Sequence, residues 1–377
     1  MTEIWVPYGP VEVSFDIKQE NLSQILEPSP VKLAPEELDI IADGVEQENL
    51  LVLSGTTGSQ KFLDILLTRN KNVKKLIYPK ALGALCRRKA QEFSLQSEPL
   101  SIENPPPDGT PSKDIGKYIP LLELDKVLLL SSIHYDPLFG LSSGPSELIR
   151  LVSDLKKLAF AEFSDELPIT PENTRASEYA LNYFQSLPML NSLEIFEKAG
   201  LGIVGTAMGD VVTAHSRSAE AWRNSLSITA PKSERVIFGC GGGDNDRNLT
   251  EAFGRALFPV LINAALPDTD AKICMLAECG NGLGSEAFLR FVTGRLEPRS
   301  KIGGVEYVDG LEVLIAFHKL QGEFNLNILT TLPKYYASKF GLKTIGGARE
   351  APTSLLQQGS RAKILVLPDA SSSAFRA

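Results

Sequence analysis

The sequence is poor in the side chains that build metal centres. It contains 3 histidines and 4 cysteines in 377 residues. The cysteines form no C-x-x-C pair and have no histidines at zinc spacing, so a structural zinc site is not expected. Cys274 lies inside an apolar run and is expected in the core. Cys240 and Cys279 each lie where a predicted strand meets a glycine-rich loop. They are either small buried residues beside tight turns, which we favour, or two thiols facing one pocket.

Excess positive charge and long apolar segments are missing as well. The formal net charge is −8, and non-specific binding of nucleic acid needs a basic face. No apolar run approaches the roughly 20 residues of a membrane span, and the N-terminus lacks the basic segment of a signal peptide. We therefore expect a cytoplasmic protein without nucleic-acid or membrane partners. The chain is long enough for two domains.

What the sequence does contain, in its second half, is a repeated design of apolar run, glycine-rich turn and helix-like segment. The two copies cover residues 235–258 and 271–291. Each run is short and apolar enough to be a strand buried on both faces of a parallel sheet. Loops that leave the carboxyl ends of such strands form the binding crevice, and helix N-termini there attract anions. This pattern predicts a cleft for a small anionic ligand.

The first half alternates between predicted strands and helices. We expect strands at residues 48–54, 74–78 and 126–131, and helices at 60–67, from about 145, and at 209–222. A loop is expected at 132–144, and the segment 227–233 is a plausible domain boundary. Such alternation is typical of an α/β fold with parallel sheets. We expect two domains, residues 1–228 and 229–377, each with a mainly parallel sheet flanked by helices.

Several short segments, in the same order along nearly the whole chain, resemble the nickel-pincer lactate racemases (LarA-type). The segments are 6–9, 11–17, 209–215, 241–248, 282–288 and 366–369. The resemblance implies the two-domain α/β fold of that family. It also implies an interdomain cleft for a 2-hydroxy acid and an isomerase activity of the racemase or epimerase type.

The residues that hold the family's cofactor are replaced in this chain. Family members bind a nickel-containing pyridinium nucleotide through a covalent lysine, and a histidine ligates the metal. The matching positions here are Ser146 and a place near Phe160. The loop that contacts nucleotide phosphate aligns with residues 55–59, where Thr57 alone keeps its type. The nickel-pincer nucleotide is thus left without its attachment residue, and we expect no metal ligand.

Two further histidines of the family, which move the substrate's hydroxyl proton, have at most one counterpart. His134 follows the carboxyl end of a predicted strand, in the loop where the family has a base, and Asp136 lies two residues on. Either could act as a general base. His215 lies on an amphipathic helix and is expected to be structural rather than functional. His318 follows an apolar run and is expected in the core.

The expected site combines these candidate bases with residues of the glycine turns and helix starts. The predicted catalytic residues are His134 and Asp136, and the predicted ligand-binding residues are Thr56, Thr57, Gly140, Ser142, Ser143, Gly144, Asp246, Arg247, Glu251, Gly282 and Ser285. A family glutamine–lysine pair corresponds here to Glu251 and Gly254, with Arg255 adjacent. Three hypotheses stay open: a divergent enzyme acting on a 2-hydroxy acid or sugar acid, a non-catalytic binding or regulatory protein, and a nickel-dependent racemase with realigned ligands.

Overall fold

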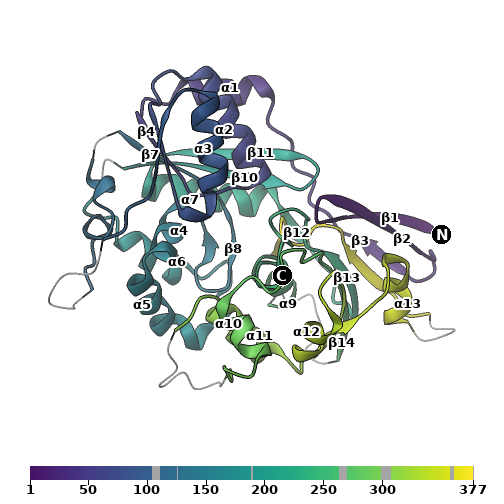
Figure 1. Ribbon diagram of the computed structural model, residues 1–377. Coiled ribbons are helices and arrows are strands. Elements are labelled where there is room, and N and C mark those ends of the chain that lie inside the picture. Colours follow the sequence, from purple (N-terminus) through teal and green to yellow (C-terminus); the bar gives the residue numbers. More distant parts are fainter. Residues whose placement is uncertain are drawn as a thin grey trace.

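The protein is an α/β structure built on two mainly parallel sheets, as the sequence predicts (Figure 1). In the described residues each of these sheets has six strands. The computed structural model describes residues 1–103, 111–124, 126–187, 190–262, 270–298, 307–356 and 361–376. Within these residues, no helix combines the length and the apolar character that crossing a membrane requires.

The first sheet has the strand order β11-β10-β7-β4-β5-β6. All its pairings are parallel except that of β11 with β10. Its strands are β4 (Asn49–Val52), β5 (Lys75–Tyr78), β6 (Gln96–Pro99), β7 (Val127–Ser132), β10 (Asn191–Lys198) and β11 (Gly202–Asp210). Side chains of β7 alternate between two cores: Leu128 and Leu130 pack on one face, and Val127 and Leu129 on the other. Because both faces are covered, the strand is apolar throughout its first four residues.

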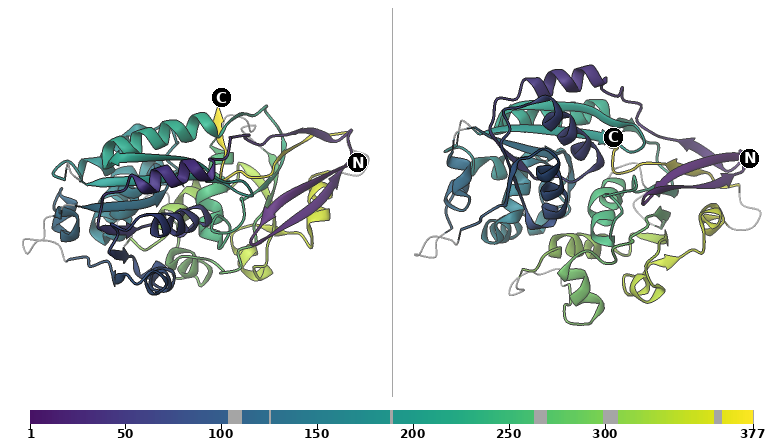
Figure 2. Two further views of the ribbon diagram at one scale, coloured as in Figure 1. Left: turned by 90° about the horizontal axis from the view of Figure 1, so that it is seen from above. Right: turned by 45° about the horizontal axis from the view of Figure 1, so that its top comes forward.

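Helices cover both faces of this sheet (Figures 1 and 2). One face carries α1 (Pro35–Asp43), α2 (Thr57–Arg69) and α3 (Gly83–Glu92). The other carries α4 (Gly144–Leu151), α5 (Ser153–Phe163), α6 (Thr174–Asn182) and α7 (Val211–Ser225). Short 3-10 turns lie at Lys80–Leu82, Ile115–Lys117, Pro120–Glu123 and Ser164–Glu166. The N-termini of α2 and α4 lie beyond the carboxyl ends of β4 and β7, where a site is expected.

The second sheet is entirely parallel, in the order β16-β15-β14-β13-β17-β3. Its strands are β3 (Leu22–Ile25), β13 (Arg235–Gly239), β14 (Ala271–Leu276), β15 (Phe324–Leu329), β16 (Lys343–Thr344) and β17 (Ile364–Leu367). The hairpin of β1 (Thr2–Tyr8) and β2 (Val11–Ile17) packs on one face of it. The strand β3 is therefore part of the second sheet and the β1–β2 hairpin packs against it, while the domain division at residues 228 and 229 stays a prediction.

Helices of the second half are shorter. They are α8 (Leu249–Ala252), α9 (Phe258–Leu261), α10 (Glu286–Val292), α11 (Leu311–Leu320), α12 (Lys334–Lys339) and α13 (Ala351–Leu355), with a 3-10 turn at Ala348–Glu350. A π-helical turn, Phe253–Leu257, joins α8 to α9 directly, so the helix-like end of the unit at 235–258 is helical, with a wider turn in its middle. One continuous core joins the two sheets and contains both Leu129 and Phe238. The strands β12 (Ser227–Thr229) and β18 (Ala374–Arg376) pair in parallel beside it.

The prediction of a loop at 132–144 is wrong in one respect. This segment contains a hairpin of β8 (His134–Asp136) and β9 (Gly140–Ser142). The Asp136 carboxylate closes its turn by accepting the N–H groups of Leu138 and Phe139 at 2.8 and 3.0 Å. Gly140 has φ 72°, and a Cβ there would lie 2.9 Å from the Thr170 carbonyl oxygen. Strands of three residues give too little alternation to be predicted from sequence.

Candidate functional site

A cleft of about 520 Å³ lies between the two domains, at the carboxyl ends of β4 and β7. Its first-domain wall consists of the start of α2, the β5–α3 connection, β8 and α4. Its second-domain wall consists of the segment from Asp244 to Arg255, with Val313 of α11. The cleft is therefore where parallel sheets ordinarily place their ligands.

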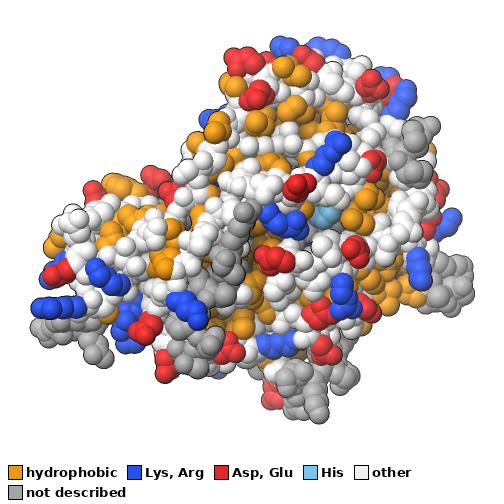
Figure 3. Space-filling model, turned by 180° about the vertical axis from the view of Figure 1, so that it is seen from behind, with side chains coloured by type: hydrophobic (Ala, Val, Ile, Leu, Met, Phe, Trp, Pro, Cys, Tyr) orange, Lys and Arg blue, Asp and Glu red, His pale blue; other side chains and the backbone are white. Residues whose placement is uncertain are grey.

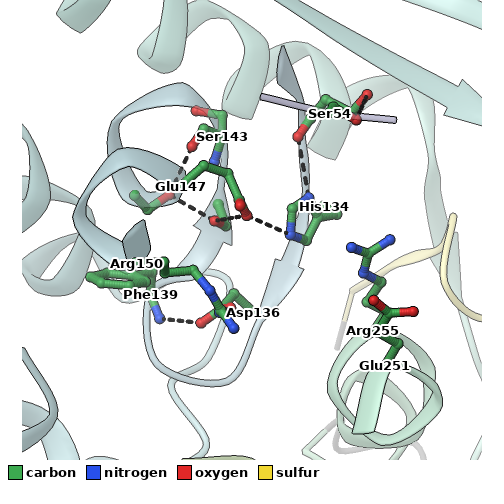
Figure 4. Close-up of polar contacts among 12 residues, drawn as sticks. Ser54, His134, Asp136, Phe139, Ser143, Glu147, Arg150, Glu251 and Arg255 are labelled. Atoms are coloured by element: carbon green, nitrogen blue, oxygen red, sulfur yellow. Dashed lines mark hydrogen bonds and ion pairs between the residues drawn. The ribbon is translucent and has the colours of Figure 1, made fainter. Parts of the chain in front are cut away.

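His134 and Glu147 form a pair in this cleft (Figure 4). The His134 Nδ1 lies 3.2 Å from the Ser132 carbonyl oxygen, and Nε2 lies 3.2 Å from Glu147 Oε1. A carbonyl oxygen only accepts, so Nδ1 carries a hydrogen and Nε2 of the neutral ring is an acceptor. Nε2 and an ionised carboxylate are both acceptors, so a hydrogen bond between them requires one further proton, carried by either group. The two side chains can thus take up and release a proton as one unit.

The environment of the pair determines the pH range in which this proton is released. Burial lowers the pKa of His134, and the positive charge of Arg255 acts in the same direction. Burial acts to raise the pKa of Glu147, but the hydrogen bond to His134 and nearby positive charges outweigh it, and the net shift is downward. The pair therefore loses its proton below the pKa of an ordinary histidine. In neutral solution it is a proton acceptor.

Arg255 faces His134 across the cleft (Figure 4). It lies on the π-helical turn, a feature that often accompanies functional sites. Its Nη1 lies 3.3 Å from Asn245 Oδ1, and among the described residues no carboxylate oxygen lies within 4.0 Å of its guanidinium nitrogens. Its charge nevertheless lowers the pKa of both His134 and Glu147. A guanidinium placed in a cleft without a carboxylate of its own suits the carboxylate of a ligand.

Three of the predicted ligand-binding residues, Thr56, Arg247 and Glu251, line the cleft together with His134 and Asp136. Arg247 is already paired, at 2.6 Å with Glu251 and at 3.5 Å with Asp244. The second carboxylate oxygen of Glu251 is buried and has no hydrogen-bond partner in the described part of the chain. Arg255, rather than Arg247, is thus the cation available to a ligand.

Asp136 lines the cleft, but its carboxylate is engaged within the protein. One oxygen accepts the two N–H groups of the hairpin turn, and the other contacts the Arg150 guanidinium. Arg150 also lies 3.5 Å from the buried Glu312. The geometry favours Glu147 over Asp136 as the proton-transferring carboxylate, while a catalytic role of Asp136 stays a prediction.

Four predicted ligand-binding residues belong to β9 and the start of α4, namely Gly140, Ser142, Ser143 and Gly144. They do not line the cleft. All four are buried. The Ser143 hydroxyl donates to Glu194 Oε1 at 2.8 Å and lies 2.6 Å from His215 Nδ1. Burial raises the pKa of Glu194 to about 7 and lowers that of His215 to about 4. This cluster anchors the start of α4, the helix that carries Glu147.

The remaining predicted residues lie at other places in the fold. Thr57 is the first residue of α2 and is not part of the cleft wall. Asp246 is buried and accepts the N–H groups of Gly9 and Glu278 at 2.9 and 3.1 Å. Gly282 and Ser285 line a separate, open hollow beside α10. Binding roles for these four residues stay predictions.

The cysteines are buried core residues, whereas His318, expected in the core, is only partly buried at the end of α11. Burial raises the pKa of the Cys279 thiol to about 12 and that of Cys240 well above its usual range. Both thiols are therefore protonated near neutral pH, which supports their interpretation as small buried residues. The His318 ring packs edge-on against Phe291, with centroids 5.1 Å apart.

On the outer surface, Figure 3 shows acidic and basic side chains interspersed over one face.

Sequence reasoning identified His134 but missed Glu147 and Arg255 as site residues. Glu147 directly follows Ser146, which stands where the resembled family has its lysine. Arg255 was adjacent to a position matched to a family lysine. Its orientation depends on the π-helical turn, which local sequence does not predict.

Comparison with known proteins supports the fold. No family model and no curated protein matches the chain. The structure is similar to that of the lactate racemase apoprotein from Thermoanaerobacterium thermosaccharolyticum, with a TM-score of 0.67 and 17% identity over 100% of both chains. It is also similar to a protein from Thermotoga maritima determined by the Northeast Structural Genomics Consortium. Here the TM-score is 0.57 and the identity 11%, over 93% of this chain and 99% of that chain. The chain thus has the lactate racemase fold.

The nickel-pincer nucleotide implied by the resemblance does not fit the residues present. The Ser146 hydroxyl is buried, lies 2.7 Å from the Ser142 hydroxyl and accepts the Ser143 N–H at 3.0 Å. Phe160 is a buried residue of α5. In the described ranges, no three histidine, cysteine, aspartate or glutamate side chains are grouped to hold a metal ion.

Proposed function

We propose that the protein binds a small carboxylate ligand, a 2-hydroxy acid, in the cleft between its domains. The observation that carries this proposal is the Arg255 guanidinium, which faces the His134–Glu147 pair and pairs with no carboxylate of the described residues. The fold shared with the lactate racemase apoprotein agrees with a ligand of this class.

In the proposed complex, Arg255 binds the ligand carboxylate through charge-assisted hydrogen bonds. The ligand's C2 and hydroxyl then face His134 and Glu147 on the opposite wall. A racemase or epimerase would use this pair to take up the C2 proton of the ligand, and inversion would then require that a proton is returned to the opposite face of C2. Ser54 and Thr56 line the same wall, and their hydroxyls are groups that can hydrogen-bond to the ligand hydroxyl.

The binding proposal is tested by calorimetric titration with both enantiomers of lactate and glycerate. Hydrogen bonds to a charged group contribute about 1.5–3 kcal/mol, or roughly 10- to 150-fold in affinity. We expect Arg255→Gln to weaken binding by at least about tenfold. Arg290→Gln is the matched control, because Arg290 pairs with Glu286 on the exposed side of α10. Equal affinities of Arg255→Gln and the wild-type protein would exclude the proposed binding mode.

Catalysis is tested separately from binding. Proton NMR in deuterium oxide measures exchange of the C2 proton, and polarimetry measures interconversion of enantiomers. For an enzyme, His134→Asn and Glu147→Gln abolish both processes while the ligand still binds.

The second candidate function is binding without turnover, as in a sensor or regulatory protein. The poor fit between the residues present and the cofactor of the resembled family favours it. Its expected result is ligand binding to the wild-type protein with neither C2 exchange nor interconversion.

A further inference from the structure

A carboxylate of the chain itself occupies the N-terminus of α2, beside the cleft. Glu197 Oε2 accepts the N–H of Gly58, in the first turn of this 13-residue helix, at 2.5 Å. The Thr56 hydroxyl, which lines the cleft, also hydrogen-bonds to Glu197. The N–H groups at the start of a helix attract anions. In this protein Glu197 supplies that anion.

The position of Glu197 follows from an irregularity in its strand. The register of β10 with β11 shifts between Phe196 and Glu197. Such a bulge re-aims the side chains beside it. On the other side β10 pairs with β7, which ends next to the cleft, and α2 packs against both strands. The bulge thus brings Glu197 to the helix start that neighbours the ligand cleft.

The charge of Glu197 acts on the cleft region. Burial raises its pKa, while hydrogen bonds from Thr56 and the Gly58 N–H lower it. Asp244 and Arg255, both in the second-domain wall, also act on the Glu197 pKa, Asp244 raising it and Arg255 lowering it. A second anionic group of a ligand on the first-domain wall would meet this carboxylate.

We propose that Glu197 determines the specificity of the cleft by excluding a second anionic group. It fills the position where a phosphate or a second carboxylate would otherwise bind, and it repels like charge nearby. Ligands with one carboxylate, bound by Arg255, are accepted, whereas phosphorylated acids are rejected. This inference rests on the proposed function for the site of the first carboxylate.

The experiment compares three ligands: lactate, with one carboxylate; 2-phosphoglycolate, with a carboxylate and a phosphate; and inorganic phosphate. Each is titrated into the wild-type protein, Glu197→Gln and Glu197→Ala. Glu197→Gln keeps the size of the side chain and an acceptor for the Gly58 N–H, so it guards against misfolding of the alanine variant. Glu36→Gln is the control, because Glu36 is exposed in the first turn of α1, on a helix that does not line the cleft.

We expect the wild-type protein and Glu36→Gln to bind lactate and to bind 2-phosphoglycolate at least about tenfold more weakly. Both Glu197 variants should gain at least about tenfold in affinity for 2-phosphoglycolate and for inorganic phosphate. Lactate affinity should rise much less than 2-phosphoglycolate affinity, because Arg255 still binds the lactate carboxylate and only the more distant charge of Glu197 is lost.

The proposed role of Glu197 would be overturned if the wild-type protein and both Glu197 variants bound 2-phosphoglycolate with the same affinity, and if the same held for phosphate. This result would leave lactate binding through Arg255 intact. Failure of the proposed function gives a different result. If neither the wild-type protein nor any variant binds lactate but the Glu197 variants gain phosphate binding, Glu197 excludes anions as proposed and the proposed function is wrong.

Discussion

The buried pair of Glu194 and His215 predicts an unusual dependence of stability on pH. Burial raises the pKa of Glu194 from 4.5 to about 7. The folded protein therefore keeps a proton that the unfolded chain releases between these pH values. Because the folded state binds more protons there, the Glu194 contribution to the free energy of unfolding falls as pH rises from 4.5 to 7. The fall amounts to about 3 kcal/mol, since one pKa unit corresponds to about 1.4 kcal/mol.

His215 contributes with the opposite sign. Burial lowers its pKa from 6.5 to about 4, so the unfolded chain binds a proton that the folded protein does not. The His215 contribution to the free energy of unfolding therefore rises between these pH values, again by about 3 kcal/mol. In the shared window the two contributions offset each other. Physically, unfolding there only moves one proton from Glu194 to His215.

Glu194→Gln separates the two contributions. The amide keeps the shape of the protonated carboxyl: its oxygen can accept a hydrogen bond from the Ser143 hydroxyl, and its NH2 can donate to the Ser218 oxygen, whose hydroxyl also contacts the His215 carbonyl. We expect the free energy of unfolding of the variant, relative to that of the wild-type protein, to increase by about 3 kcal/mol between pH of about 4.5 and about 7.5. Urea unfolding at a series of pH values measures this difference, with Glu36→Gln as the exposed control. A difference that is independent of pH would refute the reasoning.

Three further predictions concern stability and reactivity. Glu312→Ala removes a buried partner of Arg150 and Lys156, which lie 3.5 and 3.6 Å from it; urea unfolding should show a loss of about 3 kcal/mol. Gly140→Ala should lower the free energy of unfolding by about 1–3 kcal/mol, because φ is 72° and the new methyl group would meet the Thr170 carbonyl oxygen. All four cysteines are buried with raised pKa values. A thiol reagent should accordingly react slowly with the folded protein at pH 7 and quickly in urea.

Much of the fold could be predicted because its strands are marked locally. Residues 235–239 and 271–276 are short apolar runs followed by glycine, and both are central strands of the second parallel sheet. Strand β3 carries no comparable mark. It pairs with β17, whose residues are more than 300 positions later in the sequence. Nothing near residues 22–25 indicates such a partner.

The candidate site could be predicted only in part, for a related reason. His134 was identifiable because it follows the carboxyl end of a predicted strand, and such positions face a crevice. Its partner Glu147 lies 13 positions later in the sequence, beyond a hairpin that local alternation did not predict. The contact between them depends on how that hairpin and α4 meet. Side-chain partners across such a connection follow from packing, not from residue type.

The glycine-rich turn after β13, which suggested a ligand crevice, has a different explanation in the structure. A Cβ on Gly239 would lie 2.2 Å from the Val6 side chain, and one on Gly242 would lie 2.8 Å from the Gly9 carbonyl oxygen. Both neighbours belong to the N-terminal β1–β2 hairpin, so these two glycines allow close packing of that hairpin. They therefore indicate how the domain is assembled. The residues that favour a ligand are instead Arg255, whose guanidinium contacts Asn245 but no carboxylate in the described part of the chain, and the acid–base pair opposite it.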